Sequence, residues 1–128
     1  MTKRIITTTD APAPIGPYNQ AVLVNETTLY TSGQIALNPK SMELVLDNIS
    51  AETKQVMNNM KAVLKAADMN FDNVVKTSIF ISDMNNFTEI NKVYATYFNE
   101  ATAPARETVE VACLPKNVNV EISMTAIK

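Results

Sequence analysis

The sequence predicts an α+β fold, a two-layer sandwich in which two helices cover one face of a mixed β-sheet. Two segments, 50–67 and 86–98, repeat apolar residues at the period of about 3.6 residues that an amphipathic helix has. Segments rich in β-branched residues precede, separate and follow these helices. The last segment, 118–127, alternates strictly between apolar and polar residues, as a strand with one buried face does.

The length of 128 residues fits a single domain with its own core, and we expect one domain over residues 1–128. No run approaches the roughly 18 apolar residues that a membrane-spanning helix needs. The first residues lack the apolar stretch and cleavage site of a secretory signal, and the single cysteine, Cys113, cannot form an internal disulfide. We therefore expect a soluble, cytoplasmic protein without a membrane partner.

The N-terminal part is expected to form a loop and a β-hairpin. After a short apolar start at residues 3–6, three prolines in the segment 11–17 remove amide donors that a strand would need. Asn25 and Glu26 are expected at the turn of the hairpin. Strands are expected at 21–24, at 29–32 and, within a surface connection, around 44–46.

Helices and strands alternate in the rest of the chain. Ser50 suits the N-cap of the first helix, with Glu52 in its first turn. Asn86, with Glu89 three residues later, indicates a capping box for the second helix. One face of the second helix is expected in the core: Phe87, Ile90, Tyr94, Tyr97 and Phe98. Strands are expected at 74–81, about 108–113 and about 118–127.

The chain has no histidine and a net charge of −2. The absence of histidine excludes Ser-His-Asp and Cys-His catalysis and imidazole metal sites. Acid–base chemistry is therefore left to carboxylates, tyrosine, lysine or water. The charge balance lacks the basic surface that binds phosphate backbones, so we expect no nucleic-acid partner.

Only two of the eleven basic residues are arginines, Arg4 and Arg106. Arg106 follows Ala103-Pro104-Ala105 at the entrance of a strand, where its planar donors could bind both oxygens of a small carboxylate. The alternative is a surface ion pair with one of three acids: Glu107, Glu110 or Glu121.

Four other residues could contribute to a site, and each has a structural alternative. Glu121, on the polar side of the last strand, could hold a water and exchange a proton with it, or it could face solvent. Gly33 could admit a ligand to its backbone N–H. Alternatively, the backbone conformation or a close neighbour could require a residue without a side chain there. Tyr18 could donate its hydroxyl or pack, and Asn91 suits a solvated position. Cys113 is expected to be an inert core thiol.

Several motifs, in their order and spacing, resemble the RidA/YjgF/L-PSP family over nearly the whole chain. They are Gly16-Pro17-Tyr18-Asn19-Gln20-Ala21, Ser32-Gly33-Gln34-Ile35, Asn91, Pro104-Ala105-Arg106, Val109-Glu110-Val111-Ala112 and Val120-Glu121-Ile122. The resemblance implies a chorismate-mutase-like α+β protomer that assembles as a homotrimer, with ligand sites in the clefts between subunits.

The resemblance also implies hydrolysis of 2-iminobutanoate or 2-iminopropanoate to a 2-keto acid and ammonia, without a cofactor or a metal. Arg106 would bind the substrate carboxylate, Gly33 would approach it through the backbone, and Glu121 would position the attacking water. Four residues would complete the cleft, the last through its backbone carbonyl next to the imine nitrogen: Tyr18, Ser32, Asn91 and Thr108.

Three features depart from the family pattern, among them the residues next to Arg106, and two alternative functions stay open. Many relatives carry a cysteine where this chain has Thr108, and Glu107 places an extra acid beside the cationic site. Relatives are also described as single-strand endoribonucleases that inhibit translation, although the composition argues against RNA cleavage. A non-catalytic binder of small carboxylates such as 2-ketobutyrate would use the same arginine, but it would not need Glu121.

Overall fold

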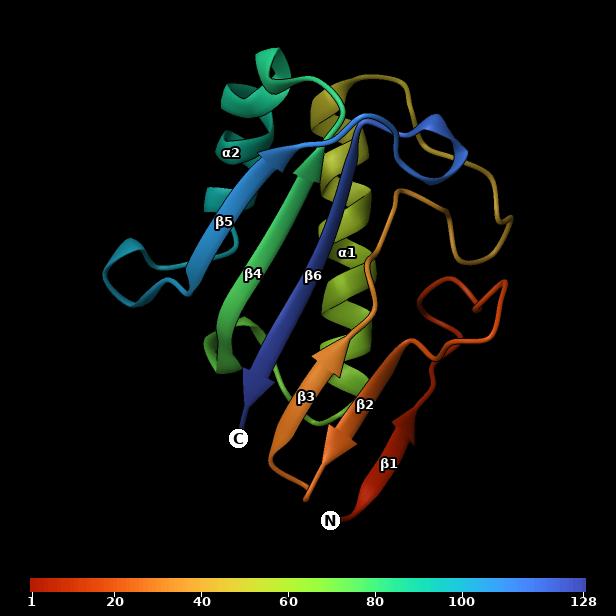
Figure 1. Cartoon of the computed structure of the whole chain (residues 1–128), viewed down its shortest axis with the longest axis vertical. Coiled ribbons are helices and arrows are strands. Elements are labelled where there is room, and N and C mark those ends of the chain that lie inside the picture. The colour runs from red at the N-terminus through yellow and green to blue at the C-terminus, as the bar shows by residue number, and fades with distance from the viewer.

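The computed structural model describes residues 1–128 and contains a six-stranded sheet with two helices on one of its faces (Figure 1). The strands are β1 (Lys3–Ile6), β2 (Ala21–Val24), β3 (Thr28–Thr31), β4 (Val74–Ile81), β5 (Ala105–Glu110) and β6 (Val120–Ile127). The helices are α1 (Ile49–Ala66) and α2 (Phe87–Ala95), both behind the sheet in Figure 1. The predicted α+β two-layer sandwich is confirmed.

The strand order is β1-β2-β3-β6-β4-β5, and only β4 and β5 run parallel. The last strand of the chain therefore lies inside the sheet. Within β6, Ala126 pairs with Leu29 of β3, and Ile122 pairs with Ile79 of β4.

The core lies between the sheet and the helices. The inward side chains of β6 are at most 3% exposed: Val120, Ile122, Met124 and Ala126. They confirm the predicted alternation, because the residues between them are only partly buried. The predicted period of α1 is confirmed as well, since its apolar stripe is fully buried: Val56, Met60, Val63, Leu64 and, just after the helix, Ala67.

The N-terminal elements match the prediction only in part. The hairpin is confirmed, and Asn25 and Glu26 both have left-handed backbones with φ of 51° and 56°. The strand β1 was not predicted, because this short, mostly exposed edge strand depends on its pairing with β2. The strand expected around 44–46 is wrong, since this segment forms only an isolated bridge between Leu37 and Leu44.

Both helices begin differently from the prediction. Asn48 caps α1, because its Oδ1 accepts a hydrogen bond from the N–H of Ala51 at 2.8 Å. Ser50 instead donates its hydroxyl to Glu89 of α2. Asn86 makes no side-chain cap, so the predicted capping box is wrong. A contact between the two helices thus occupies the side chains that the local pattern assigns to caps.

The strand predicted at 108–113 lies at Ala105–Glu110, because parallel pairing with β4 begins directly after Pro104. Arg106 is therefore the second residue of a strand. Cys113 lies outside the sheet and is exposed, with its Sγ 3.2 Å from Oδ1 of Asn117. The prediction of a core thiol is wrong.

Glu52 is a buried carboxylate that fixes the start of β6. Its side chain accepts hydrogen bonds from the N–H of Asn119 at 2.8 Å, from Nδ2 of Asn119 at 2.7 Å and from the N–H of Val120 at 3.3 Å. Its position in the first turn of α1 also suits a negative charge. Glu52 thereby joins α1 to the residue that precedes Glu121.

We expect Glu52→Gln to lower the free energy of unfolding by about 2 kcal/mol, because an amide group would turn its own N–H donors toward partners that are all donors. Urea unfolding followed by circular dichroism measures this change. Glu43→Gln, at an exposed glutamate, is the matched control and should stay within about 0.5 kcal/mol of wild type. Equal unfolding midpoints for the two variants would contradict the role of Glu52.

Candidate functional site

Arg106 lies at the β5 edge of the sheet, beside α2. Its Nη1 donates a hydrogen bond to Oδ1 of Asn91 at 2.7 Å. Its Cζ lies 5.0 Å from the ring centroid of Tyr94 and 5.8 Å from that of Phe87. Nε and Nη2, the side fork of the guanidinium, have no partner in the chain. This fork is free to bind an anion, and Asn91 is a partner of Arg106 rather than a solvated residue.

None of the acids considered as ion-pair partners binds Arg106. Glu107, the next residue in the strand, points to the opposite face and pairs with Lys76 at 3.1 Å, which lowers the pKa of the Glu107 carboxyl. Glu110 accepts the N–H of Met84 at 2.8 Å. The surface ion pair is therefore wrong as an account of Arg106, and Glu107 does not lie beside the cationic site.

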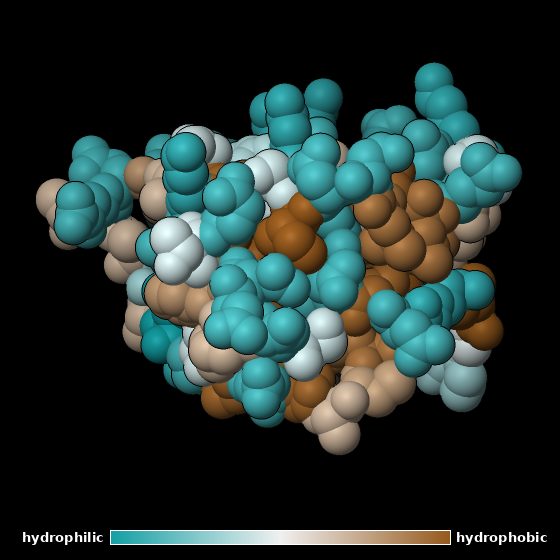
Figure 2. Space-filling model, turned by 90° about the horizontal axis from the view of Figure 1, so that it is seen from above, coloured by the Kyte–Doolittle hydropathy of each residue, from teal (hydrophilic) through white to brown (hydrophobic).

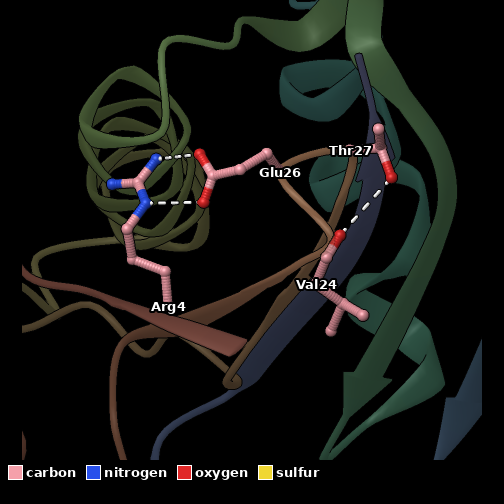
Figure 3. A network of polar contacts seen from close by, with 4 residues as sticks. All are labelled: Arg4, Val24, Glu26 and Thr27. Carbon is pink, nitrogen blue, oxygen red and sulfur yellow. Dashed lines mark hydrogen bonds and ion pairs between the residues drawn. The ribbon is translucent and has the colours of Figure 1, made fainter. Parts of the chain in front are cut away.

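The other arginine illustrates the chemistry that the free fork of Arg106 allows. Nε and Nη2 of Arg4 each donate to one carboxylate oxygen of Glu26 at 2.9 Å (Figure 3). These hydrogen bonds lower the pKa of the Glu26 carboxyl. Arg4 is thus occupied within the chain, and Arg106 alone keeps both fork donors for a ligand.

Thr108 presents its backbone at the same edge. Val111 donates its N–H to Ile81 of β4, and backbone groups point alternately to the two sides of a strand. The N–H and C=O of Thr108 therefore point away from β4, where β5 has no neighbour. The hydroxyl of Thr108 is buried without a hydrogen-bond partner. We call Asn91, Tyr94, Arg106 and Thr108 the arginine site.

Glu121 lies in a separate cleft of about 320 Å³, between the proline-rich loop (residues 11–17), the segment after β3 and the loop before β6. Four predicted site residues line it: Tyr18, Ser32, Gly33 and Glu121. Its apolar walls are formed by Pro12, Ile15, Ile35, Leu37 and Pro115. Figure 2, which looks down on the end of the molecule where β4 and β5 finish, shows apolar side chains exposed among polar ones. We call the cleft that contains Glu121 the glutamate cleft.

Gly33 is a glycine because Glu121 occupies the space of a side chain. A Cβ at this position would lie 2.1 Å from Oε1 and 2.8 Å from Cδ of Glu121. The φ of Gly33 is not positive, so the demand is steric rather than conformational. Gln34 and Ile122 exchange backbone hydrogen bonds of 2.8 and 3.1 Å, which hold this segment against β6. Partial burial raises the pKa of the Glu121 carboxyl, so it does not simply face solvent.

Tyr18 and Ser32 differ in what they can offer a ligand. The hydroxyl of Ser32 donates to the carbonyl of Asn19, so it shapes the loop. The hydroxyl of Tyr18 accepts the N–H of Ile15 at 3.4 Å, and its own proton has no acceptor in the chain. Tyr18 is 47% exposed, which leaves that donor accessible in the glutamate cleft.

One copy of the chain does not bring all the predicted site residues together. Arg106 pairs with Thr77, which is fully buried beneath α2, and so points to the helix-covered side of the sheet. Glu121 lies between the buried Val120 and Ile122 and points to the opposite side. A small substrate cannot touch both residues within one copy.

The sequence predicts only core positions for the two rings next to the guanidinium of Arg106, Phe87 and Tyr94. Their spacing of four and three residues from Asn91 places all three on neighbouring turns of α2, and this spacing is the signal that could have identified them. For the proline-rich loop the sequence predicts no more than a loop, and the structure shows that it lines the glutamate cleft. No group of three or more His, Cys, Asp or Glu side chains is arranged to hold a metal ion. Neither helix has the length and apolar character needed to cross a membrane.

Proteins of known family match this chain along most of its length. The family model described as endoribonuclease L-PSP matches residues 8–128. A RutC family protein of Synechocystis is 52% identical over 99% of this chain and 98% of its own. The human 2-iminobutanoate/2-iminopropanoate deaminase is 46% identical, over 98% of this chain and 90% of its own. The crystal structure of E. coli TdcF with bound serine has a TM-score of 0.91 and 38% identity, with 98% of each chain covered. The chain therefore belongs to the RidA/YjgF/L-PSP family.

Proposed function

We propose that this protein hydrolyses 2-imino acids, such as 2-iminobutanoate and 2-iminopropanoate, to 2-keto acids and ammonia. The observation that carries the proposal is the unpaired side fork of Arg106, held in place by Asn91 and two aromatic rings. Such a fork matches the two oxygens of a carboxylate. Relatives named as imine deaminases, and a relative with bound serine, which carries a carboxylate, support the same chemistry.

The proposed active site needs a second copy of the chain. We propose a homotrimer in which the arginine site of one subunit meets the glutamate cleft of the next. The opposite orientations of Arg106 and Glu121 support this arrangement. So does the helix-free face of the sheet, which exposes between 39% and 52% of four large apolar residues: Ile5, Tyr30, Val109 and Ile127.

In the proposed reaction, the substrate carboxylate binds Nε and Nη2 of Arg106, and the imine N–H donates to the carbonyl of Thr108. The carboxylate of Glu121 takes a proton from water as the water oxygen adds to the imine carbon. It returns that proton to the imine nitrogen, which gives a carbinolamine. Glu121 then takes the proton of the new hydroxyl and delivers it to the amine nitrogen, as the carbonyl forms, the C–N bond breaks and ammonia leaves. One water is consumed, and no electrons are exchanged. Positioning the carboxylate and the water supplies most of the rate acceleration.

A carboxylate binder without catalysis is the second candidate, because the serine bound in TdcF requires no reaction. Glu121 favours the hydrolase, since in the proposed trimer it would lie beside the bound anion, where a binder gains nothing from an acid. Gly33 supports this role because it leaves room for the Glu121 carboxylate. The endoribonuclease activity in the family's name has less support here, because the chain has no histidine and a net charge of −2.

The first test adds the protein to a threonine dehydratase reaction that contains semicarbazide, which competes for the imine. The wild type should divert the product to free 2-ketobutyrate. Arg106→Lys keeps the charge but loses the fork, and it should lower kcat/KM about 100-fold. Arg4→Lys is the matched control and should change kcat/KM by less than about twofold, because its exposed pair contributes little. No diversion by the wild type would refute the deaminase, and an active Arg106→Lys would refute the role of the fork.

Gly33→Ala should displace the carboxylate of Glu121 and lower kcat about tenfold or more, because the new Cβ would overlap Oε1. At Gly16, a Cβ would lie 3.4 Å from the ring of Tyr18, an ordinary contact, so Gly16→Ala is the control. Steady-state kinetics and thermal unfolding of both variants make the comparison. Equal kcat values in correctly folded variants would show that the position of Glu121 does not matter.

Glu121 must be ionised to act as the base, and burial raises its pKa above 4.5, the ordinary value for a glutamate. In a plot of kcat against pH, the fall on the acid side should therefore lie above pH 4.5. Activity should fall as the pH drops through that raised pKa, in a profile measured between about pH 4 and 8. The same shift means that ionised Glu121 opposes folding. Glu121→Gln should therefore be more stable than wild type above the raised pKa and similar to it below. A constant kcat down to pH 4.5 would contradict the assignment of Glu121 as the base.

A further inference from the structure

The guanidinium of Arg106 is held over an aromatic ring as well as by a hydrogen bond. Its Cζ lies 5.0 Å from the ring centroid of Tyr94, inside the range of a cation–π contact, and 5.8 Å from that of Phe87. Asn91 accepts a hydrogen bond from Nη1 only. A single hydrogen bond leaves the plane of the guanidinium free to turn, whereas contact with a ring face restricts it.

Tyr94 is itself fixed in the core. It is 5% exposed, and its hydroxyl donates a hydrogen bond to Oγ1 of Thr77 at 3.1 Å. Thr77, on β4, is fully buried. The ring centroid of Tyr94 also lies 4.7 Å from that of Phe98. The ring of Tyr94 is therefore less mobile than an exposed side chain would be. It provides a rigid surface at the sheet edge.

The supporting contacts come from three elements that the fold brings together. Thr77 lies opposite Arg106 in the β4–β5 register. The side chain of Tyr94 extends from α2 to the hydroxyl of Thr77. The ring therefore occupies the space between α2 and the strand that carries Arg106. With Nη1 bound to Asn91, the unpaired Nε–Nη2 fork is the part of the guanidinium that remains for a carboxylate.

We infer that Tyr94 is the positioning residue of the carboxylate-binding arginine, with its ring setting the plane in which Arg106 presents its fork. The inference rests on the proposed function for the identity of the ligand. The positioning itself concerns only residues of this chain. The ring face of Tyr94 is the part that positions Arg106, and the hydroxyl of Tyr94 anchors the ring.

The presence of only two arginines makes a direct test possible. In an NMR spectrum of arginine Nε–H groups, the folded protein should give two signals, and Arg4→Lys and Arg106→Lys assign them. In the wild type, the signal of Arg106 should be displaced upfield by the ring below it, while that of Arg4 should not. An undisplaced Arg106 signal in the wild type would overturn the inference before any variant is made.

Three variants then separate the ring from its hydroxyl and from general stability. Tyr94→Leu should move the Arg106 signal to an ordinary position and weaken binding of 2-ketobutyrate about tenfold. Tyr94→Phe keeps the ring face and should stay within about threefold of wild-type affinity. Tyr97→Leu is the control, because that ring packs edge-on against Phe71 and makes no contact with Arg106. In all three, the unchanged signal of Arg4 reports that the protein is folded.

Kinetics distinguish positioning from loss of folded protein. Tyr94→Leu should raise KM about tenfold, whereas partial unfolding would lower kcat at constant KM. A wild-type KM and affinity in Tyr94→Leu would overturn the inference while leaving the deaminase intact. If the wild type proves inactive as a deaminase, the displaced signal and the weaker binding of 2-ketobutyrate still test the positioning by themselves.

Discussion

The pairing of β6 with β3 on one side and β4 on the other holds the two halves of the sheet together. The N-terminal strands β1, β2 and β3 contact β4 and β5 in the sheet only through it. Its inward side chains form the centre of the core, and its outward side chains include Glu121. Because the last strand of the chain joins both halves, this pairing brings together residues from opposite ends of the sequence. The glutamate cleft exists only once β6 is in place, since Gly33 and Gln34 lie against it.

Four of the six buried polar side chains support one of the two sites. Gln20 donates to two carbonyls of the proline-rich loop, and Asn59 of α1 donates to two carbonyls after β3. Glu52 binds the backbone that leads into Glu121, and Thr77 accepts the hydroxyl of Tyr94. Breaking one of these hydrogen bonds would leave a buried polar group without a partner, which is costly. Each bond therefore confines a loop or a ring that its other contacts would leave mobile. The irregular segments around the sites are thereby tied to regular elements, which gives reacting groups a constant position without additional secondary structure.

The pleat of the sheet explains why one copy of the chain carries two incomplete sites. Successive side chains of a strand point to opposite faces, and the pairing registers place Arg106 on the face of the helices and Glu121 on the free face. A shift of either strand by one residue would reverse this, but it would also bury polar residues and expose the core. Under the proposed function, catalysis then depends on association between copies, because only a neighbour can supply the missing group. The residues that determine assembly and those that determine chemistry would lie on the same strands.

The sequence by itself determined the elements with a periodic signal. The helices α1 and α2 and the strand β6 follow from periodicity, because alternation and helical spacing directly record which side is buried. The strand β4 follows from its run of β-branched and aromatic residues. The residue types and motifs also identified Arg106 and Glu121 as candidates. Only the tertiary structure decided the strand β1, the start of β5 and the contact that removes Ser50 and Glu89 from capping, because each depends on a partner far along the chain. It likewise decided that Arg106 rests on Tyr94, that Glu121 fills the space beside Gly33, and that the two charged groups face opposite ways. These contacts depend on strand order and register, which no local pattern of residues encodes.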